Sequence, residues 1–449
     1  MKKYSAYKPS NNYWIGELPR EWQLKKLKYV IEGKLKYGAN ESAELDDQSL
    51  PRYIRITDFR DDGKLREDTF KSLSLDKAEN YFLEEGDILF ARSGATVGKT
   101  FQFKDYKGLA CFAGYLIKAK PDQKIILSDF LYYMTKSNYY DNWKESVFIQ
   151  ATIQNIGADK YSNFILPVPS INEQNIIVHF LNKQTEKIDK LISNKQKLID
   201  LYKKERIAVI NKTVLKGINP DTEMKYSGID WLGDIPIGWE VKRLKYVSNT
   251  RISNVDKKSE DEIIVSLCNY MDVYKNDFID NTLEFMQATA TPSQIVNFEL
   301  KLDDVLITKD SETSDDIGIP AYVSLVNTKG IICGYHLAQI TTNKDVLFGK
   351  YLFRLLQASN YKDYFDMSSK GVTRFGLGTY SIINLFVPLP SIEEQHSISN
   401  FLDREISKID KAIWIVEQQI SSLKEYRTAL ISEVVTGKID VRDEVVSWT

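Results

Sequence analysis

The sequence has few of the residues from which metal sites, disulfide frameworks and membrane spans are built. Its 449 residues include three histidines and three cysteines, and Cys111, Cys268 and Cys333 show no CxxC spacing. No apolar run approaches the roughly 18 residues that a membrane span needs. The first lysines are not followed by the apolar core of a secretory signal. We therefore expect a cytoplasmic protein with no metal site and no disulfide framework.

A strong net charge is also absent. Lysine and arginine total 60 and aspartate and glutamate total 62, so the formal charge is -2. Taken alone, this balance argues against a dedicated nucleic-acid binder, although a sum does not show how charges are distributed over a surface. The hydrophobic share of 43% is ordinary for a soluble globular protein. The length predicts two domains.

The chain is a tandem duplication. Residues 14–30, WIGELPREWQLKKLKYV, match residues 231–247, WLGDIPIGWEVKRLKYV. Residues 164–170, FILPVPS, match residues 385–391, LFVPLPS, and each copy continues through Ile-x-Glu-Gln into a long charged segment. We predict globular domains at residues 1–170 and 219–390, long helices at residues 171–218 and 391–440, and a tail at residues 441–449.

The two long segments carry the apolar spacing of a coiled coil. Between Leu402 and Val434, apolar residues recur at steps of four and three, which is a heptad seam. The segment from Leu181 has a matching seam, interrupted by Lys195 and Arg206. One amphipathic helix of this length cannot bury its stripe alone. Either each helix packs on its own domain, or the two helices pair antiparallel as a spacer; the presence of two similar helices favours pairing.

Each half also predicts a hairpin and an aromatic helix. Residues 86–92, GDILFAR, and 303–309, DDVLITK, have the apolar pattern of strands that lead into small-residue loops and a second strand. The aromatic residues around Phe130, Tyr140 and Tyr361 recur at helical spacing. Such residues form a core more often than a stacking platform for bases.

Residues 93–100, SGATVGKT, end like a phosphate-binding P-loop. A P-loop has four residues between its glycines and opens a helix. Here three residues separate Gly94 from Gly98, the following residues alternate like a strand, and the second repeat has no Gly-Lys pair. We therefore interpret the glycines as turn residues and expect no ATP site.

Several basic and polar positions suit contact with a duplex. A basic edge on a predicted short helix after each Trp-Gly-Pro motif could contact phosphates without recognising sequence, or could be a solvated helix face. The polar loops at residues 150–157 and 371–378 differ between the repeats; they suit hydrogen bonds to base edges, or are surface connectors. The predicted DNA-binding residues are Lys25, Lys28, Arg55, Arg92, Ser93, Lys99, Thr100, Gln150, Thr152, Gln154, Asn155, Lys242, Arg243, Lys309, Ser311, Thr313, Lys370, Thr373 and Arg374.

Signatures of catalysis are absent. The sequence contains no (Asn/Asp)-Pro-Pro-(Phe/Tyr) segment and no glycine-rich cofactor loop after a leading strand, as a methyltransferase would have. Acidic residues do not cluster around a lysine in both repeats, as a nuclease would need. The chain is expected to be non-catalytic.

With these motifs combined, the sequence resembles the specificity (S) subunit of type I restriction-modification systems over nearly its whole length. The resemblance implies an α+β protein, in which two target recognition domains each recognise one half of a split DNA target and two antiparallel coiled-coil helices join them. It implies two modification subunits and restriction subunits as partners, which bind S-adenosylmethionine and ATP, so that this chain holds no cofactor. The helices would offer a subunit interface, including Glu173, Gln174, Glu394 and Gln395.

Two other interpretations remain open from the residues alone. The chain could be a non-catalytic scaffold that carries two protein-binding domains on a coiled coil. A weaker alternative is a self-contained modification enzyme, which would bind its cofactor without a partner.

Overall fold

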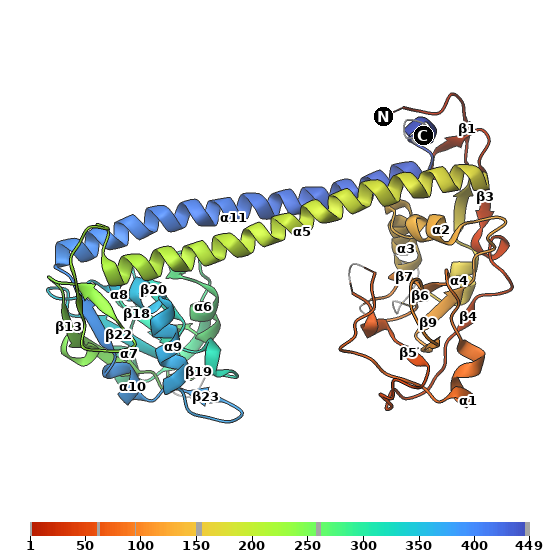
Figure 1. The fold of residues 1–449 in the computed structure, drawn as a ribbon. Helices are drawn as coiled ribbons and strands as arrows, with labels where there is room; N and C mark the ends of the chain where they lie inside the picture. Colours follow the sequence, from red (N-terminus) through yellow and green to blue (C-terminus); the bar gives the residue numbers. More distant parts are fainter. Residues whose placement is uncertain (1, 61–62, 95, 150–154, 257–261, 445–449) are drawn as a thin grey trace. The chain divides into compact units, whose positions relative to one another are not determined.

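The computed structural model describes residues 2–60, 63–94, 96–149, 155–256 and 262–444 (Figure 1). The chain forms two compact units, one from Met1–Gln196 with Gln418–Thr449 and the other from Lys197–Glu417. The helices α5 (Ile171–Lys216) and α11 (Ile392–Val435) each contribute one half to each unit. We call these units the first and the second unit and describe each by itself.

The first unit is built around a four-stranded antiparallel sheet in the order β4-β9-β6-β7. Its central strand β6 carries the apolar run Ile-Leu-Phe-Ala, and all four residues are buried. A short parallel pair, β5 and β8, accompanies the sheet. The elements are β4 (Lys36–Tyr37), β5 (Arg52–Ile54), η2 (Ile56–Asp58), α1 (Leu75–Ala78), η3 (Glu79–Tyr81), β6 (Ile88–Ala91), β7 (Thr100–Gln102), β8 (Ala110–Phe112), β9 (Leu116–Ala119), α2 (Ser128–Met134), α3 (Asn138–Ile149) and α4 (Ala158–Ser162).

The second unit repeats this sheet order and extends it. Its main sheet runs β14-β22-β18-β20-β16, and a three-stranded sheet β17-β15-β21 is added beside it. The elements are β14 (Ser248–Ile252), β15 (Ile263–Cys268), α6 (Tyr270–Lys275), β16 (Phe278–Ile279), β17 (Met286–Ala290), α7 (Pro292–Phe298), β18 (Val305–Thr308), β19 (Asp310–Ser311), η5 (Ser314–Asp316), β20 (Pro320–Val323), β21 (Ile331–Cys333), β22 (Leu337–Thr342), α8 (Gly349–Leu356), α9 (Ser359–Ser368), β23 (Phe375–Gly376) and α10 (Thr379–Ile383).

Both predicted hairpins are confirmed. β6 pairs antiparallel with β7, and β18 pairs antiparallel with β20. The segment after Gly98 is therefore strand β7 rather than the helix that a P-loop would open, and Gly94 and Gly98 take positive φ angles of 80° and 79° as turn residues. The aromatic residues Phe130, Tyr140 and Tyr361 are fully or almost fully buried, as predicted for a core.

The two repeated motifs of each half form one piece of structure. The strand β3 (Gln23–Lys26) pairs antiparallel with β10 (Ile165–Val168), the strand that leads into α5. In the second unit, β13 (Glu240–Arg243) pairs in the same way with β24 (Phe386–Leu389) before α11. The neighbouring elements are the hairpins of β1 (Tyr7–Pro9) with β2 (Glu17–Pro19) and of β11 (Met224–Tyr226) with β12 (Asp234–Pro236), the turns η1 (Leu27–Tyr29) and η4 (Leu244–Tyr246), and η6 (Arg442–Glu444).

This pairing corrects the prediction of a basic edge on a short helix. Lys25, Lys242 and Arg243 lie in strands, and Lys28 lies in a single 3-10 turn. The physical reason is the partner strand: the N–H of Leu27 donates to the carbonyl of Phe164 at 2.8 Å, so the backbone is held by a distant segment before a helix can form.

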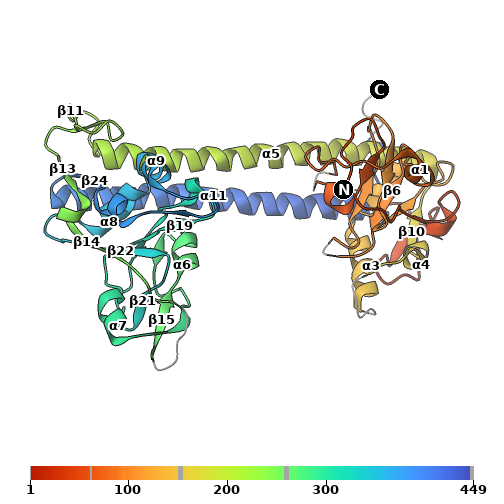
Figure 2. The ribbon, with the colours of Figure 1, turned by 90° about the horizontal axis from the view of Figure 1, so that it is seen from below.

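The prediction of two long helices is confirmed, with 46 residues in α5 and 44 in α11. In the first unit, the N-terminal half of α5 lies beside the C-terminal half of α11 (Figures 1 and 2), and Leu181 and Val434 belong to one core with β6. In the second unit, Val214 and Leu402 share a core with β18. The two alternatives from the sequence are thus both realised, because the same apolar stripe packs on the partner helix and on the sheet domain.

Polar contacts join the two helices in both units, and in the first unit they show that the helices run antiparallel. In the first unit, Arg427 Nε donates to Asp189 Oδ1 at 2.9 Å and Lys195 Nζ donates to Gln419 Oε1 at 2.6 Å. In the second unit, Arg206 Nε lies 3.3 Å from Asp410 Oδ1. The two cations that interrupt the predicted seam therefore reach polar partners at its edge. No helix in the described ranges is both long and apolar enough to cross a membrane.

Gln174 and Gln395 join the long helices to the sheet domains. Both side chains are fully buried. The amide of Gln174 accepts from Leu127 N at 2.8 Å and donates to Ile125 O and Pro169 O, each at 2.9 Å. Gln395 makes the same three bonds, with Phe348 N, Val346 O and Pro390 O.

The prediction that Gln174 and Gln395 contact another subunit is therefore wrong, because their amides are buried and bonded within the chain. Of the neighbouring glutamates, Glu394 accepts from Trp239 Nε1 at 3.1 Å, and Glu173 is half-buried. Burial and the nearby Glu173 carboxylate together raise the pKa of Tyr4. Glu394 thus bonds to an aromatic residue of its own unit.

We predict that Gln395→Ala lowers the stability of the second unit. The substitution leaves one buried N–H and two buried carbonyls without their side-chain partner, which is expected to lower the free energy of unfolding by about 2–3 kcal/mol. Chemical denaturation followed by circular dichroism measures the change. Asn400→Ala, at an exposed position of the same helix, is the control, and an equal effect of both substitutions would contradict the role of Gln395.

Candidate nucleic-acid interface

Each unit brings its two predicted recognition loops together. In the second unit, β19 pairs antiparallel with β23, so that Ser311 lies opposite Phe375. In the first unit, Ser93 forms a β-bridge with Asn155, and the N–H of Ile156 donates to the carbonyl of Arg92 at 2.8 Å. Loops that are about sixty residues apart in the chain therefore form one surface at the end of the β6 and β18 strands.

A charged cluster occupies this surface in the second unit. Asp310 Oδ2 accepts from Lys309 Nζ at 2.8 Å and lies 2.7 Å from His336 Nδ1. Arg374 Nη2 lies 3.1 Å from His336 Nε2. Arg374 Nη2 also lies 3.2 Å from His336 Nδ1, so the guanidinium lies against the imidazole ring. Arg374 itself is exposed.

His336 stands in an unusual backbone conformation. Its φ angle is 72°, a left-handed value that residues other than glycine rarely take. The carboxylate of Asp310 holds the ring, and the carbonyl of His336 accepts from Lys309 N at 2.9 Å. The cluster therefore fixes the imidazole beside Arg374, so that the exposed guanidinium projects from a supported position.

Asp310 is the ionised centre of the cluster. Burial by itself would raise the pKa of its carboxyl group, but hydrogen bonds from Lys309 and His336 outweigh burial and lower the pKa below its ordinary value. The carboxylate is therefore charged at neutral pH and balances the cations around it.

The other predicted residues of the second unit lie around this cluster. Ser311 is half-buried in β19, and Thr313 is exposed at the residue before η5. Lys370 forms a β-bridge with Gly376, and its side chain is exposed, as is that of Thr373. These side chains are accessible beside Arg374.

On the equivalent surface of the first unit, an arginine packs on an aromatic ring. The Arg92 guanidinium lies over the Tyr37 ring at 5.0 Å, and the Tyr37 hydroxyl accepts from Ala158 N at 3.0 Å. Asn155 and Lys99 are exposed beside it, whereas Thr100 is buried and its hydroxyl is bonded to Thr135 at 2.7 Å. The predicted residues Gln150, Thr152 and Gln154 lie outside the described residues.

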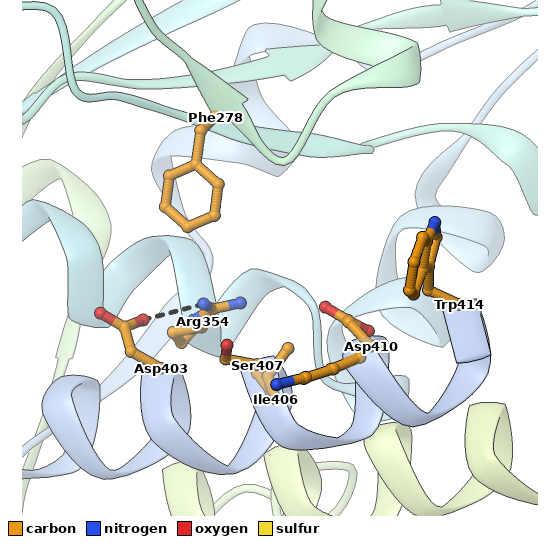
Figure 3. Close-up of a pocket in the computed structure, with 8 residues that line it drawn as sticks. Phe278, Arg354, Asp403, Ile406, Ser407, Asp410 and Trp414 are labelled. Atoms are coloured by element: carbon orange, nitrogen blue, oxygen red, sulfur yellow. Dashed lines mark hydrogen bonds and ion pairs between the residues drawn. The ribbon is translucent and has the colours of Figure 1, made fainter.

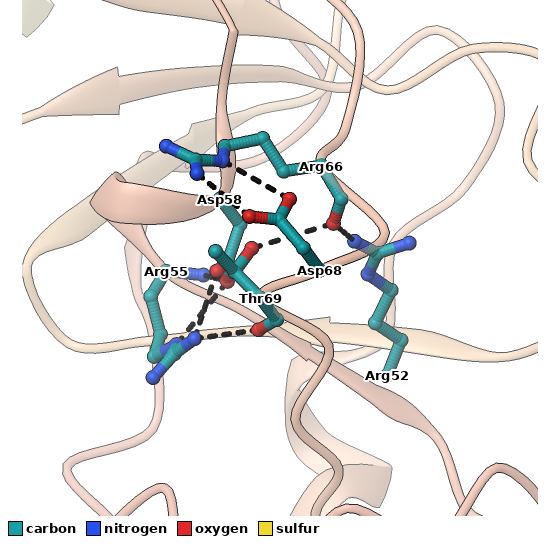
Figure 4. A network of polar contacts seen from close by, with 6 residues as sticks. All are labelled: Arg52, Arg55, Asp58, Arg66, Asp68 and Thr69. Atoms are coloured by element: carbon teal, nitrogen blue, oxygen red, sulfur yellow. Dashed lines mark hydrogen bonds and ion pairs between the residues drawn. The ribbon is translucent and has the colours of Figure 1, made fainter. Parts of the chain in front are cut away.

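Arg55 takes part in a polar network within the first unit. Its guanidinium donates to both oxygens of Asp58 and, at 2.7 Å, to the carbonyl of Thr69 (Figure 4). Arg66 and Arg52 extend this network through Asp68 and the carbonyl of Arg66. These bonds from Nε and Nη2 hold the loop after β5 together, and the DNA contact of Arg55 stays a prediction.

The basic edge is also partly used within each unit. Lys26 Nζ donates to Asn163 Oδ1 at 3.1 Å, and the equivalent Arg243 donates to Asn384 Oδ1 at 3.1 Å. These two residues tie the β3 and β13 strands to the segments after α4 and α10. Lys28 and Lys242 are exposed, and Lys242 pairs with Glu240 at 3.0 Å.

Two further features were not found from the sequence. A basic pocket of the first unit contains Lys136, Arg60 and Arg66. In the second unit, a groove of about 510 Å³ lies between Phe278 and α11, where Arg354 Nη2 donates to Asp403 Oδ1 at 2.9 Å and Trp414 stands at the edge (Figure 3). The indole of Trp414 is 58% exposed, which is unusual for the largest apolar side chain.

The described residues contain no group of three or more histidine, cysteine, aspartate or glutamate side chains that could hold a metal ion. Cys111, Cys268 and Cys333 are free thiols, each of them buried. Burial raises the pKa of Cys111 to about 12. No nucleophile activated by its surroundings is therefore evident among these thiols.

Comparison with known proteins gives a consistent result. A family model described as the type I restriction modification DNA specificity domain matches the chain twice, over residues 19–201 and 236–424. The putative type I restriction enzyme MjaX specificity subunit of Methanocaldococcus jannaschii is 24% identical over 443 residues, 95% of this chain and 96% of that protein. The MjaVIII specificity subunit of the same organism is 23% identical over 440 residues, 95% of each chain.

Solved structures show the same fold. A chain from a study of complex assembly and conformational transition of the type I R-M system gives a TM-score of 0.71 at 15% identity, over 94% of this chain and 99% of that chain. The HsdS subunit from Thermoanaerobacter tengcongensis gives a TM-score of 0.52 at 15% identity, over 94% and 98% of the two chains.

We predict a pH-dependent contribution of Asp310 to stability. Because folding lowers the pKa of this carboxyl group from its ordinary 3.8, the ionised form stabilises the folded second unit above that pH, and the contribution is lost as the pH falls through the lower folded value. Asp310→Asn should lower the free energy of unfolding by about 1–2 kcal/mol at pH 7.

The measurement is denaturant unfolding between pH 2 and 7. The difference between wild type and Asp310→Asn should be small at the acidic end and constant above about pH 5. Asp315→Asn, at an exposed position, serves as the control. A difference that does not change with pH would contradict the assignment.

Proposed function

The chain belongs to the type I restriction-modification DNA specificity family, and on that premise we propose that it is the DNA specificity subunit of such a complex. Each unit recognises one half of a bipartite target. The chain itself performs no chemistry on DNA. The observation that carries this proposal is the pairing of two divergent loops on a scaffold that is otherwise repeated.

Base recognition is assigned to the paired loops. The scaffold residues around them repeat, whereas the loop sequences differ: Arg374 and Phe375 of the second unit align with Ile153 and Gln154 of the first. An arginine that is held by a neighbouring side chain and exposed at its tip suits bidentate hydrogen bonding to guanine in the major groove. Different side chains on equal scaffolds allow the two units to recognise different sequences.

Phosphate contact is assigned to the exposed cations outside the loops. Lys28 and Lys242 are exposed beside the β3 and β13 strands, and Lys99 and Lys370 are exposed beside the recognition loops. Such contacts position a duplex and carry no sequence information. The net charge of -2 over the whole chain is compatible with this role if partner subunits supply further phosphate contacts.

We assign the long helices the role of a spacer. The 46 residues of α5 correspond to about 69 Å at 1.5 Å per residue. The number of base pairs between the two recognised sequences would then follow from helix length rather than from any base contact.

Two modification subunits are the proposed direct partners, with restriction subunits joining the complex. The groove beside Trp414 is a suitable docking surface in the second unit, because Ile415 and Leu201 are also exposed on the long helices there, 40% and 60%. Exposed apolar side chains of this size are typical of protein interfaces. S-adenosylmethionine and ATP are assigned to the partner subunits rather than to this chain.

Replacing Arg374 tests base recognition. Arg374→Ala removes a bidentate donor, so discrimination at one position of one half of the target should fall by about 1–3 kcal/mol while the other half is unchanged. Mapping methylated sites genome-wide in cells that carry the chain and its modification subunits measures the change. Lys362→Ala, at an exposed position of α9, is the control, and an unaltered target in both variants would contradict the assignment.

Shortening the helices tests the spacer role. Deleting residues 190–196 and 419–425 removes one heptad from each helix, and it removes Lys195 together with its partner Gln419. The loss of about 10 Å of helix should shorten the unrecognised gap by about three base pairs, with both recognised sequences intact. Methylation mapping again gives the result. A changed half-sequence with an unchanged gap would count against the spacer.

A further inference from the structure

A basic pocket lies in the first unit beside the recognition surface. Its volume is about 420 Å³, and its walls are the loop after β5 and the β6–β7 hairpin. The residues that matter to the argument are Arg60, Arg66, Thr96, Lys99, Phe101 and Lys136. None of the lining residues that the structure describes is acidic.

Lys136 is the least expected member of this pocket. Its ammonium group donates to the carbonyl of Thr100 at 2.7 Å and lies 4.6 Å from the centre of the Tyr132 ring. No carboxylate lies within ion-pair distance of it among the described residues. Lys136 is half-buried, and a lysine that loses part of its hydration without an opposite charge beside it calls for an explanation.

The charged groups that act on Lys136 are mostly positive. Burial, the first cause, and repulsion by Arg427, Lys144 and Lys99 lower its pKa to about 8, and Asp141 opposes the shift only partly. Two carboxylates of the first unit already have other partners: Asp141 pairs with Lys144, and Asp68 pairs with Arg66, each at 2.7 Å. An anion in the pocket would therefore be attracted by several cations at once.

The pocket also has an apolar wall. The rings of Phe59 and Phe101 stack at a centroid distance of 4.0 Å, and both residues line the cavity. A cavity with cations on one side and flat aromatic surface on the other fits a phosphate together with the sugar attached to it. Ala91 and Thr96 also line the cavity, and they belong to the same β6–β7 hairpin as Arg92 and Ser93.

The second unit has no equivalent lysine. The Ser-Asn-Tyr segment after Lys136 matches the Ser-Asn-Tyr segment after Ala358, so Ala358 takes the place of Lys136. The tyrosines of the two segments make the same bond, from the Tyr139 hydroxyl to Ile165 O and from the Tyr361 hydroxyl to Phe386 O. A feature that differs between two copies of one scaffold is more easily explained by the separate task of each copy than by the fold.

We propose that this pocket binds one backbone phosphate of the DNA strand recognised by the first unit, with Lys136 as its central ligand. The proposal rests on the proposed DNA-binding function and adds a specific anchoring point to it. A phosphate held there sets the register of the strand against Arg92, Ser93 and Asn155, which contribute to recognition through their own contacts. Lys136 is thus a positioning residue that does not choose the bases.

The test uses the full chain in complex with its modification subunits and a duplex that contains the target. Lys136→Gln, which removes the charge and keeps a long polar side chain, should weaken binding by about fivefold to tenfold at 0.1 M salt and reduce the slope of log affinity against log salt by about one. The recognised sequence should not change. Lys104→Gln in the same unit, where the lysine pairs with Asp129 at the surface, is the matched control.

A second experiment tests the phosphate directly. Single neutral methylphosphonate linkages are placed in turn along the half-target of the first unit. At one position the substitution should weaken binding of the wild type but have no additional effect on Lys136→Gln, and Lys136→Arg should restore the sensitivity. Such coupling cannot result from a general loss of stability.

The outcomes separate the two proposals. If the wild-type complex binds no specific duplex, the proposed function fails. If it binds and Lys136→Gln matches the wild type in affinity and salt slope, or if no linkage shows coupling to Lys136, the phosphate pocket is refuted while the proposed function stands.

Discussion

The burial of one apolar stripe against two surfaces is the constraint on which the structure depends. In the first unit, α5 and α11 pack on each other and on the β4-β9-β6-β7 sheet within a single core. The second unit does the same with the other halves of both helices. The first core needs residues from both ends of the chain, whereas the second unit is the continuous segment Lys197–Glu417, so only the first unit depends on the C-terminal residues. The glutamine bonds at Gln174 and Gln395 fix the point where each helix leaves its domain.

This constraint explains which residues repeat between the two halves of the chain and which residues differ. Residues that repeat between the halves are mostly structural: Asp87 and Asp304, for example, accept from the backbone N–H of Glu84 and Lys301 at the turn before β6 and β18. Burial raises the pKa of both carboxyl groups, as expected for side chains used inside the fold. Residues that differ lie on the paired loops, where a change does not disturb the core. A duplicated protein can therefore acquire two recognition sequences without loss of stability.

The two units support their exposed arginines by different means. Arg92 rests on the ring of Tyr37, whereas Arg374 is supported by the charged cluster of Asp310, Lys309 and His336. Cation–π contact tolerates more movement than a hydrogen-bonded cluster does. The second unit also extends the parallel pair β15–β21, the counterpart of β5–β8, with the strand β17. The two units thus share one backbone scaffold, whereas the side chains that support their exposed arginines differ.

The sequence by itself determined the duplication, the two long helices, the hairpins and the buried aromatic residues, because these follow from local periodicity and from repeated motifs. Only the tertiary structure decided the strand identity of Lys25 and Lys242, the internal roles of Gln174, Gln395 and Arg55, and the pocket around Lys136. These features depend on contacts between segments far apart in the chain, such as β3 with β10. A side chain's charge and spacing say which contacts it can make, whereas its surroundings in the fold determine which contacts it does make.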